Sequence, residues 1–94
     1  MKNKIHEMVN ATRKVYILRH LETNEFICLR QDTKEYVACF TDGDSARQFR
    51  EELGLVEYVD VAAMRIGDTP FDNFWLDGDM IGRSLLTTEH ARSA

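Results

Sequence analysis

The spacing of apolar positions changes within the first forty residues, from a helical period to short strand-like runs. One helix face is outlined by the spacing i, i+3, i+4 and i+7 at Ile5, Met8, Val9 and Thr12. Asn3 stands where an N-cap residue would satisfy the first free backbone N–H groups. The pattern therefore predicts a short N-terminal helix over residues 3–12, which needs tertiary packing to persist.

Three runs rich in β-forming residues follow, at 15–20, 26–30 and 36–40. The segments that separate them are short and polar. Strands joined by such short turns are antiparallel neighbours, because a parallel crossover needs about a dozen or more residues. The sequence therefore predicts an antiparallel β-meander.

A second helix is predicted from about residue 45 to residue 53. The segment 41–45 breaks the preceding strand and offers several N-cap residues, and Asp42 and Asp44 place negative charge at the positive end of the helix. Gly54 suits the left-handed residue that ends many helices, with Leu55 supplying the apolar contact that accompanies it.

The second half of the chain predicts one further strand and a segment with two interpretations. Residues 55–66 alternate as a strand does. Asp77-Gly78 between apolar flanks is typical of a tight β-hairpin, whereas Thr69-Pro70 would suit the start of a short helix. Residues 83–94 are expected to form a flexible tail. Together these features predict a single small α+β domain over residues 1–94, with an antiparallel β-meander, a packed helix, an additional strand and a short N-terminal helix.

Both faces of the predicted meander are apolar. With Thr33 and Lys34 at the tip of the second turn, Cys28 pairs with Cys39. One face then collects Ile27, Leu29, Tyr36, Ala38 and Phe40, and the other collects Phe26, Cys28, Val37 and Cys39. The helix after the meander covers only one face. The N-terminal helix, the aromatic C-terminal segment or a second copy of the chain must cover the other, and a homodimer is predicted on this ground.

Composition and charge narrow the class of protein. The 94 residues carry a formal net charge of −4, with the acidic excess in the second half of the chain. An acidic chain lacks the basic face that nucleic-acid binding requires. No run approaches the roughly 20 apolar residues of a membrane span, and no apolar segment follows the N-terminal lysines as in a signal peptide. The sequence therefore predicts a cytoplasmic protein with no nucleic-acid or membrane partner.

Residues that carry chemistry show no catalytic or metal-binding spacing. Cys28 and Cys39 are expected to be buried, reduced thiols rather than a disulfide framework. The three histidines, His6, His20 and His90, are scattered and lack the spacing of metal ligands. We therefore expect no catalytic residue, no cofactor and no metal.

A local resemblance accompanies these features. Residues 36–41, a strand that ends in Phe40-Thr41, and Ala46 in the next helix are similar to a pattern in the N-terminal domain of the SseB family. Several uncharacterised bacterial families share the same order of meander and helix. The resemblance covers about a fifth of the chain and implies a non-enzymatic accessory domain, without carrying over any site residue.

The function predicted from these observations is an intracellular protein-interaction or regulatory module that is non-catalytic and homodimeric. Its contact surface is expected to include Phe71, Phe74, Trp75, Leu76, Phe26 and Val37. The alternative is a small-molecule binding protein or minor enzyme with a pocket between the sheet and residues 71–76. Cys39, His20 and Trp75 would be the polar or stacking groups of that pocket.

Overall fold

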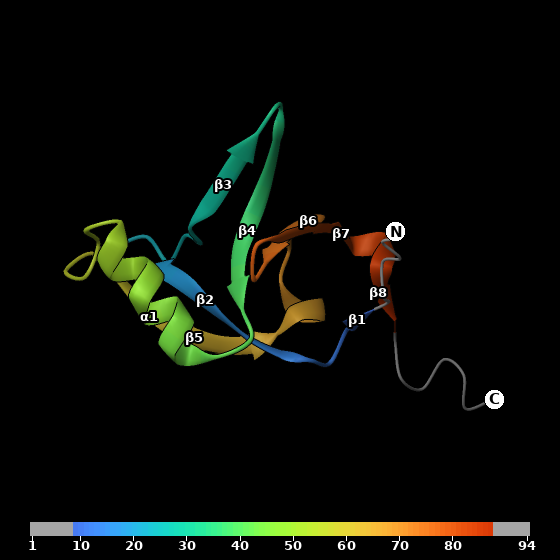
Figure 1. Cartoon of the computed structure of the whole chain (residues 1–94), viewed down its shortest axis with the longest axis horizontal. Coiled ribbons are helices and arrows are strands. Elements are labelled where there is room, and N and C mark those ends of the chain that lie inside the picture. Colours follow the sequence, from blue (N-terminus) through green and yellow to red (C-terminus); the bar gives the residue numbers. More distant parts are fainter. Residues whose placement is uncertain (1–8, 88–94) are drawn as a thin grey trace.

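The computed structural model describes residues 9–87, which form short strands and one α-helix that lies against one face of the main sheet (Figure 1). In chain order the elements are β1 (Val9–Asn10), β2 (Lys14–His20), β3 (Cys28–Gln31), β4 (Lys34–Phe40), α1 (Gly43–Glu52), β5 (Val59–Arg65), the 3₁₀ helix η1 (Ile66–Asp68), β6 (Asn73–Leu76), β7 (Asp79–Gly82), the 3₁₀ helix η2 (Arg83–Leu85) and β8 (Leu86–Thr87). The described part of the chain is therefore mixed α+β and mostly β, which is the class that the sequence predicts.

The main sheet is mixed rather than purely antiparallel. Its strands lie in the order β5-β2-β4-β6-β7, with β3 paired to β4 beside this row. β4 and β6 are parallel, and the remaining pairs of this sheet are antiparallel. The crossover from β4 to β6 includes α1 and β5, so it has the length that a parallel connection needs. β1 and β8 form a separate parallel pair close to the two ends of the described chain.

The arrangement of β2, β3 and β4 differs from the predicted meander. β4 pairs with β2 through Phe40 and Cys39, and with β3 through its other half. β2 and β3 share only the isolated bridge between Arg19 and Phe26. The chain bends after that bridge, and the β3–β4 hairpin projects from the rest of the sheet (Figure 1). Since β3 is shorter than β4, the C-terminal half of β4 bonds to β2 instead.

The predicted register of the β3–β4 hairpin is wrong by two residues. Cys28 lies opposite Val37, not Cys39, and the turn residues are Asp32 and Thr33, with Asp32 at a φ of 59°. A shift by two residues preserves the alternation of side chains between the faces. Val37 and Cys39 accordingly lie in one hydrophobic cluster and Ala38 and Phe40 in the other, as the sequence predicts.

Helix α1 ends as its sequence indicates, and it begins at Gly43, two residues before the predicted start. The Asp42 carboxylate caps it by accepting hydrogen bonds from the backbone N of Ser45 at 2.7 Å and from its hydroxyl at 3.0 Å. Gly54 has a φ of 70°, and the N–H groups of Gly54 and Leu55 donate to the carbonyls of Glu51 and Arg50. These two bonds define a Schellman ending, so this part of the prediction is confirmed.

Two expectations about the ends of the chain need correction. Val9 and Asn10 form β1 rather than the end of a helix, and the remainder of the predicted N-terminal helix lies outside the described residues. The predicted tail forms η2 and β8 as far as Thr87, and its last residues also lie outside the described part. β1 and β8 pair with each other. Each strand therefore provides hydrogen-bond partners for backbone groups of the other that have none within their own segment.

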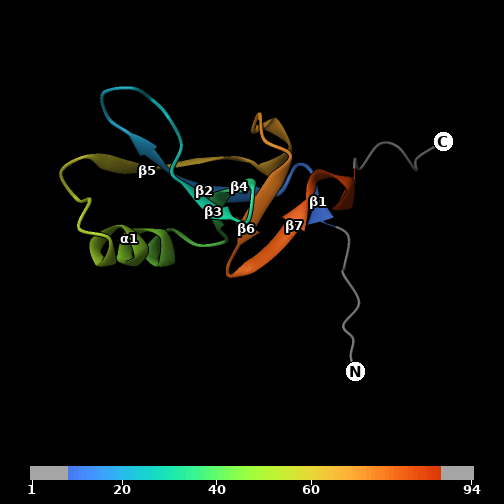
Figure 2. The same ribbon diagram turned by 90° about the horizontal axis from the view of Figure 1, so that it is seen from above.

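Each face of the sheet is covered by a different part of the same chain. Helix α1 packs on one face, where Ala46 and Phe49 join a cluster around Ala38 and Phe40 (Figure 2). The opposite face carries apolar side chains that precede β2 or follow β5, which are Val9, Ile66, Phe71, Ile81, Leu85 and Leu86. The aromatic C-terminal segment, one of the three covers that the sequence left open, therefore contributes to this cover.

Candidate functional site

The six residues of the predicted contact surface do not form one exposed surface. Phe74 and Val37 are completely buried and lie opposite each other on β6 and β4. Their side chains are therefore not part of the exposed surface of the described chain. The other four, Phe71, Trp75, Leu76 and Phe26, are partly buried.

Trp75 belongs to an aromatic cluster under helix α1. Its ring centroid lies 5.8 Å from that of Phe40, in an edge-on arrangement, and 5.5 Å from that of Phe49. Phe40 and Phe49 are themselves 5.3 Å apart. Aromatic pairs at these separations stabilise a core beyond the area that they bury. The contacts therefore give Trp75 a structural role on the helix-covered face.

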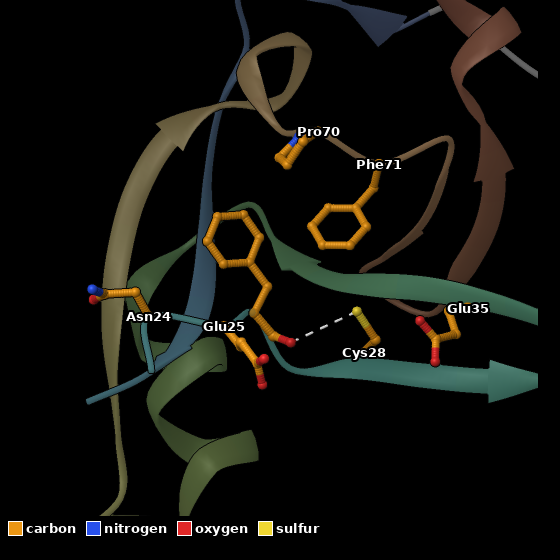
Figure 3. Close-up of a pocket in the computed structure, with 7 residues that line it drawn as sticks. Asn24, Glu25, Cys28, Glu35, Pro70 and Phe71 are labelled. Atoms are coloured by element: carbon orange, nitrogen blue, oxygen red, sulfur yellow. Dashed lines mark hydrogen bonds between the residues drawn. The ribbon is translucent and has the colours of Figure 1, made fainter. Parts of the chain in front are cut away.

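Phe26 and Phe71 contribute to an open groove of about 440 Å³ on the opposite face (Figure 3). Their ring centroids are 5.4 Å apart, with an angle of 39° between the ring planes. We call this site the phenyl groove; its lining residues are Asn24, Glu25, Phe26, Cys28, Glu35, Pro70 and Phe71. The β2–β3 turn, the base of the β3–β4 hairpin and the loop before β6 each supply part of it. The groove thus joins segments that are distant in the sequence.

The lining of the phenyl groove is acidic and aromatic. It contains the carboxylates of Glu25 and Glu35 but no lysine or arginine. Glu35 forms an ion pair with Arg30 across the hairpin, at 3.0 Å, and both side chains are mostly exposed. An exposed pair of this kind contributes at most about 1 kcal/mol, so Arg30 is readily displaced from Glu35.

The two cysteines are free thiols on the same face of the sheet. Burial, and secondly the nearby Glu35 carboxylate, raise the pKa of Cys28, whose Sγ donates to the carbonyl oxygen of Phe26 at 3.7 Å (Figure 3). Burial, followed by the charge of Asp77 and the proximity of Cys28, raises the pKa of Cys39 to about 12. Neither thiol has the thiolate character that a nucleophile needs at neutral pH.

The groups proposed for a pocket lie elsewhere. Cys39, His20 and Trp75 are all absent from the lining of the phenyl groove, whereas Cys28 is part of it. His20 Nδ1 accepts a hydrogen bond from the backbone N of Glu22 at 3.3 Å. The sequence indicated a pocket beside the Phe71 segment but not the residues of β3 and the β2–β3 turn, because the bend after Phe26 has no local sequence signal.

A second surface feature lies at the end of the molecule away from β1 and β8. Four large apolar side chains there are between 45% and 56% exposed, namely Leu21, Leu53, Val56 and Tyr58. The N–H of Leu21 donates to the carbonyl of Tyr58 at 2.8 Å, which joins the β2–β3 turn to the loop between α1 and β5 (Figure 2). We call this group the apolar end patch. Sequence reasoning missed it because its members come from two turns.

Exposed acidic residues lie in the same segments as the apolar end patch. The exposed glutamates of the two segments and of the adjoining helix end are Glu22, Glu51, Glu52 and Glu57. The nearby basic groups already have partners, since Arg19 pairs with Asp60 at 3.9 Å and Arg50 donates to the carbonyl of Val59 at 3.4 Å. The segments that carry the patch therefore also carry four exposed glutamates, which we call its acidic rim.

Residues 9–87 contain neither a candidate metal site nor a helix that could cross a membrane. No group of three or more histidine, cysteine, aspartate or glutamate side chains in this range is arranged to hold a metal ion. The same residues include no helix with the length and apolar character needed to cross a membrane. Comparison of the chain with protein-family models, with curated proteins and with solved structures finds no match.

Proposed function

We propose that this chain is a non-catalytic protein-interaction module that binds a basic, apolar segment of another protein at the apolar end patch. The observation that carries the proposal is the collection of four exposed apolar side chains at one end of the molecule. Scattered exposed apolar residues are ordinary, but a group of them inside a charged rim is typical of a contact surface.

The acidic rim favours a basic partner over a second copy of the chain. In a two-fold dimer the same patch would meet itself, so the glutamates of one copy would face those of the other. Like charges at an interface oppose association, whereas lysine or arginine residues of a partner would be attracted. The partner is therefore expected to present apolar residues flanked by basic ones.

The original argument for the homodimer predicted from the sequence no longer holds. That argument required an uncovered sheet face, and the chain's own segments cover both faces. Self-association remains a prediction that only a measurement of mass in solution can test.

The binding proposal is tested with a synthetic peptide that alternates leucine and lysine, labelled for fluorescence anisotropy. We expect this peptide to bind, and Val56→Ser and Tyr58→Ala to weaken binding, with about 1 kcal/mol or more lost at each anchor residue. The matched control is Met80→Ser, since Met80 is 48% exposed but lies on β7, outside the patch. Equal binding of a leucine-glutamate peptide, or an equal loss in the Met80 variant, would contradict the proposal.

The alternative function, a small-molecule binding protein, is favoured by one specific observation. The phenyl groove lies between the sheet and Phe71, which is the place that the alternative requires. It has the size of a small ligand site and combines apolar walls with a few polar groups.

A further inference from the structure

We infer that the phenyl groove is a binding site for an organic ammonium ion, with the cation held against the Phe26 and Phe71 rings and near the Glu25 and Glu35 carboxylates. The inference is independent of the apolar end patch and of the partner proposed for it. It names the class of ligand from the chemistry of the groove.

The aromatic walls favour a cation with an aliphatic stem. The faces of phenyl rings attract ammonium groups through the ring quadrupole, and the attraction grows when the cation is partly shielded from water. Phe26 and Phe71 stand 5.4 Å apart at the groove, and Pro70 extends the apolar wall (Figure 3). An alkyl chain can therefore bury its methylene groups where the ammonium is also attracted.

The negative charge of the phenyl groove excludes anionic ligands. Glu25 and Glu35 line it without any basic residue, so a carboxylate or phosphate ligand would meet repulsion. No lysine or arginine lies within ion-pair distance of Glu25 among the described residues. Glu25 is therefore available to an incoming cation.

Arg30 acts as an internal competitor at one side of the groove. Its guanidinium pairs with Glu35 at 3.0 Å, and its side chain is 70% exposed. Removal of the guanidinium leaves the Glu35 carboxylate free for the ligand. Arg30→Gln should consequently strengthen binding of the ammonium ion. Substitution of the lining residues should have the reverse effect and weaken it.

The test is titration of the full chain with n-butylammonium, followed by two-dimensional NMR of the backbone amides of Glu25, Cys28 and Phe71. n-Butanol and butyrate are the neutral and anionic probes of the same stem length. We expect shifts with butylammonium that exceed those with butanol, and none that saturate with butyrate. Equal responses to butylammonium and butanol, or no saturable response, would overturn the inference.

Variants make the test specific to the groove. Glu35→Gln and Phe71→Leu should each weaken butylammonium binding by about two- to fivefold, and Arg30→Gln should strengthen it by a similar factor. Asp79→Asn is the control, because Asp79 is an exposed carboxylate on β7 outside the groove. Weaker binding by the Arg30 variant would contradict competition between Arg30 and the ligand for Glu35. An equal loss in the Asp79 variant would show that general charge and not the groove attracts the ion.

Two further arms identify the source of the ammonium. A short peptide with one central lysine among glycines is compared with the same peptide carrying norleucine. Tighter binding of the lysine peptide than of butylammonium would assign the site to a lysine of a protein partner. Tighter binding of the free amine would assign it to a small molecule. Circular dichroism of each variant confirms that it folds, and a variant that unfolds is replaced by Glu25→Gln.

Discussion

Two aspartates each fix a local conformation: Asp77 fixes the turn between β6 and β7, and Asp42 caps helix α1. Asp77 and Gly78 have φ angles of 50° and 96°, which make the tight turn between β6 and β7. The Asp77 carboxylate also accepts hydrogen bonds from the backbone N of Thr41 at 3.1 Å and from its hydroxyl at 2.7 Å. One residue therefore forms the hairpin turn and attaches it to the end of β4.

Asp77→Ala should lower the free energy of unfolding by about 1–2 kcal/mol, because a charge-assisted pair of hydrogen bonds is lost and alanine resists a positive φ. Urea unfolding followed by circular dichroism measures the change. Asp79→Ala, two residues along the same hairpin, should change the value by less than about 0.5 kcal/mol. A loss of the same size in both variants would contradict the role given to Asp77.

The cap of helix α1 gives the protein a pH dependence in the acid range. The hydrogen bonds from Ser45, first from its backbone N and then from its hydroxyl, hold the pKa of Asp42 below its usual value of 3.8. Since the ionised form is favoured in the folded state, its contribution to stability is present above pH 3.8. It is lost as the pH falls through the lowered pKa of the folded state.

Asp42→Asn should remove this pH dependence without removing the cap, because asparagine also accepts a hydrogen bond at an N-cap position. The urea midpoint of the natural sequence should fall more steeply than that of the variant between pH 5 and the acid limit of folding. Parallel falls would show that the carboxylate of Asp42 does not supply this part of the stability.

At the scale of elements, Arg83 joins the start of η2 to the loop before β6. Its guanidinium donates to the carbonyl oxygens of Gly67 at 3.3 Å, of Thr69, and of Phe71 at 2.8 Å from Nε. It also lies 5.4 Å from the centre of the Phe74 ring. These contacts fix the segment that carries Pro70 and Phe71, which form one side of the phenyl groove.

Arg83→Met keeps the apolar stem but removes the donors of three carbonyl groups, so it should lower the free energy of unfolding by about 1–3 kcal/mol. It should also broaden the NMR signal of the Phe71 amide. Arg65→Met is the control, since Arg65 is exposed at the end of β5. If the Arg65 variant loses as much stability, the carbonyl contacts of Arg83 are not the cause.

At the scale of the whole molecule, the described chain covers both faces of its sheet. Helix α1 and the C-terminal segments pack on opposite sides, so each apolar face has a cover from the same chain. A second copy is then not required to shield apolar surface. The remaining exposed apolar group is the end patch, whose acidic rim opposes self-pairing.

Light scattering should accordingly give the mass of one chain at low ionic strength, where repulsion between acidic rims is strongest. A dimeric mass at low salt would contradict this expectation and restore the homodimer predicted from the sequence. Repeating the measurement with Val56→Ser would then show whether the end patch forms the contact.

Much of the local structure could be predicted because it depends on neighbouring residues. Asp42 and Gly54 mark the ends of α1, and Asp77-Gly78 marks a hairpin. The assignment of Val37, Cys39, Ala38 and Phe40 to two faces also follows from alternation alone. It survived an error of two residues in the register, since such an error leaves each side chain on its original face.

The partners of the strands depended on contacts between distant segments. The parallel pairing of β4 with β6, the bend after Phe26 and the pairing of β1 with β8 bring together segments with no shared local signal. The phenyl groove depends on the bend after Phe26, and Phe74 and Val37 are buried together in one core cluster where β4 pairs with β6.

The sequence by itself determined where α1 ends and which strand residues share a face, and it offered the Asp77-Gly78 hairpin as one of two alternatives. Backbone conformation and side-chain alternation decide these features within a few residues. Only the tertiary structure decided which segment covers each face, and therefore which apolar residues stay exposed. Which segment covers a face depends on how distant segments compete for the same buried surface. The residues of one segment alone therefore do not predict it.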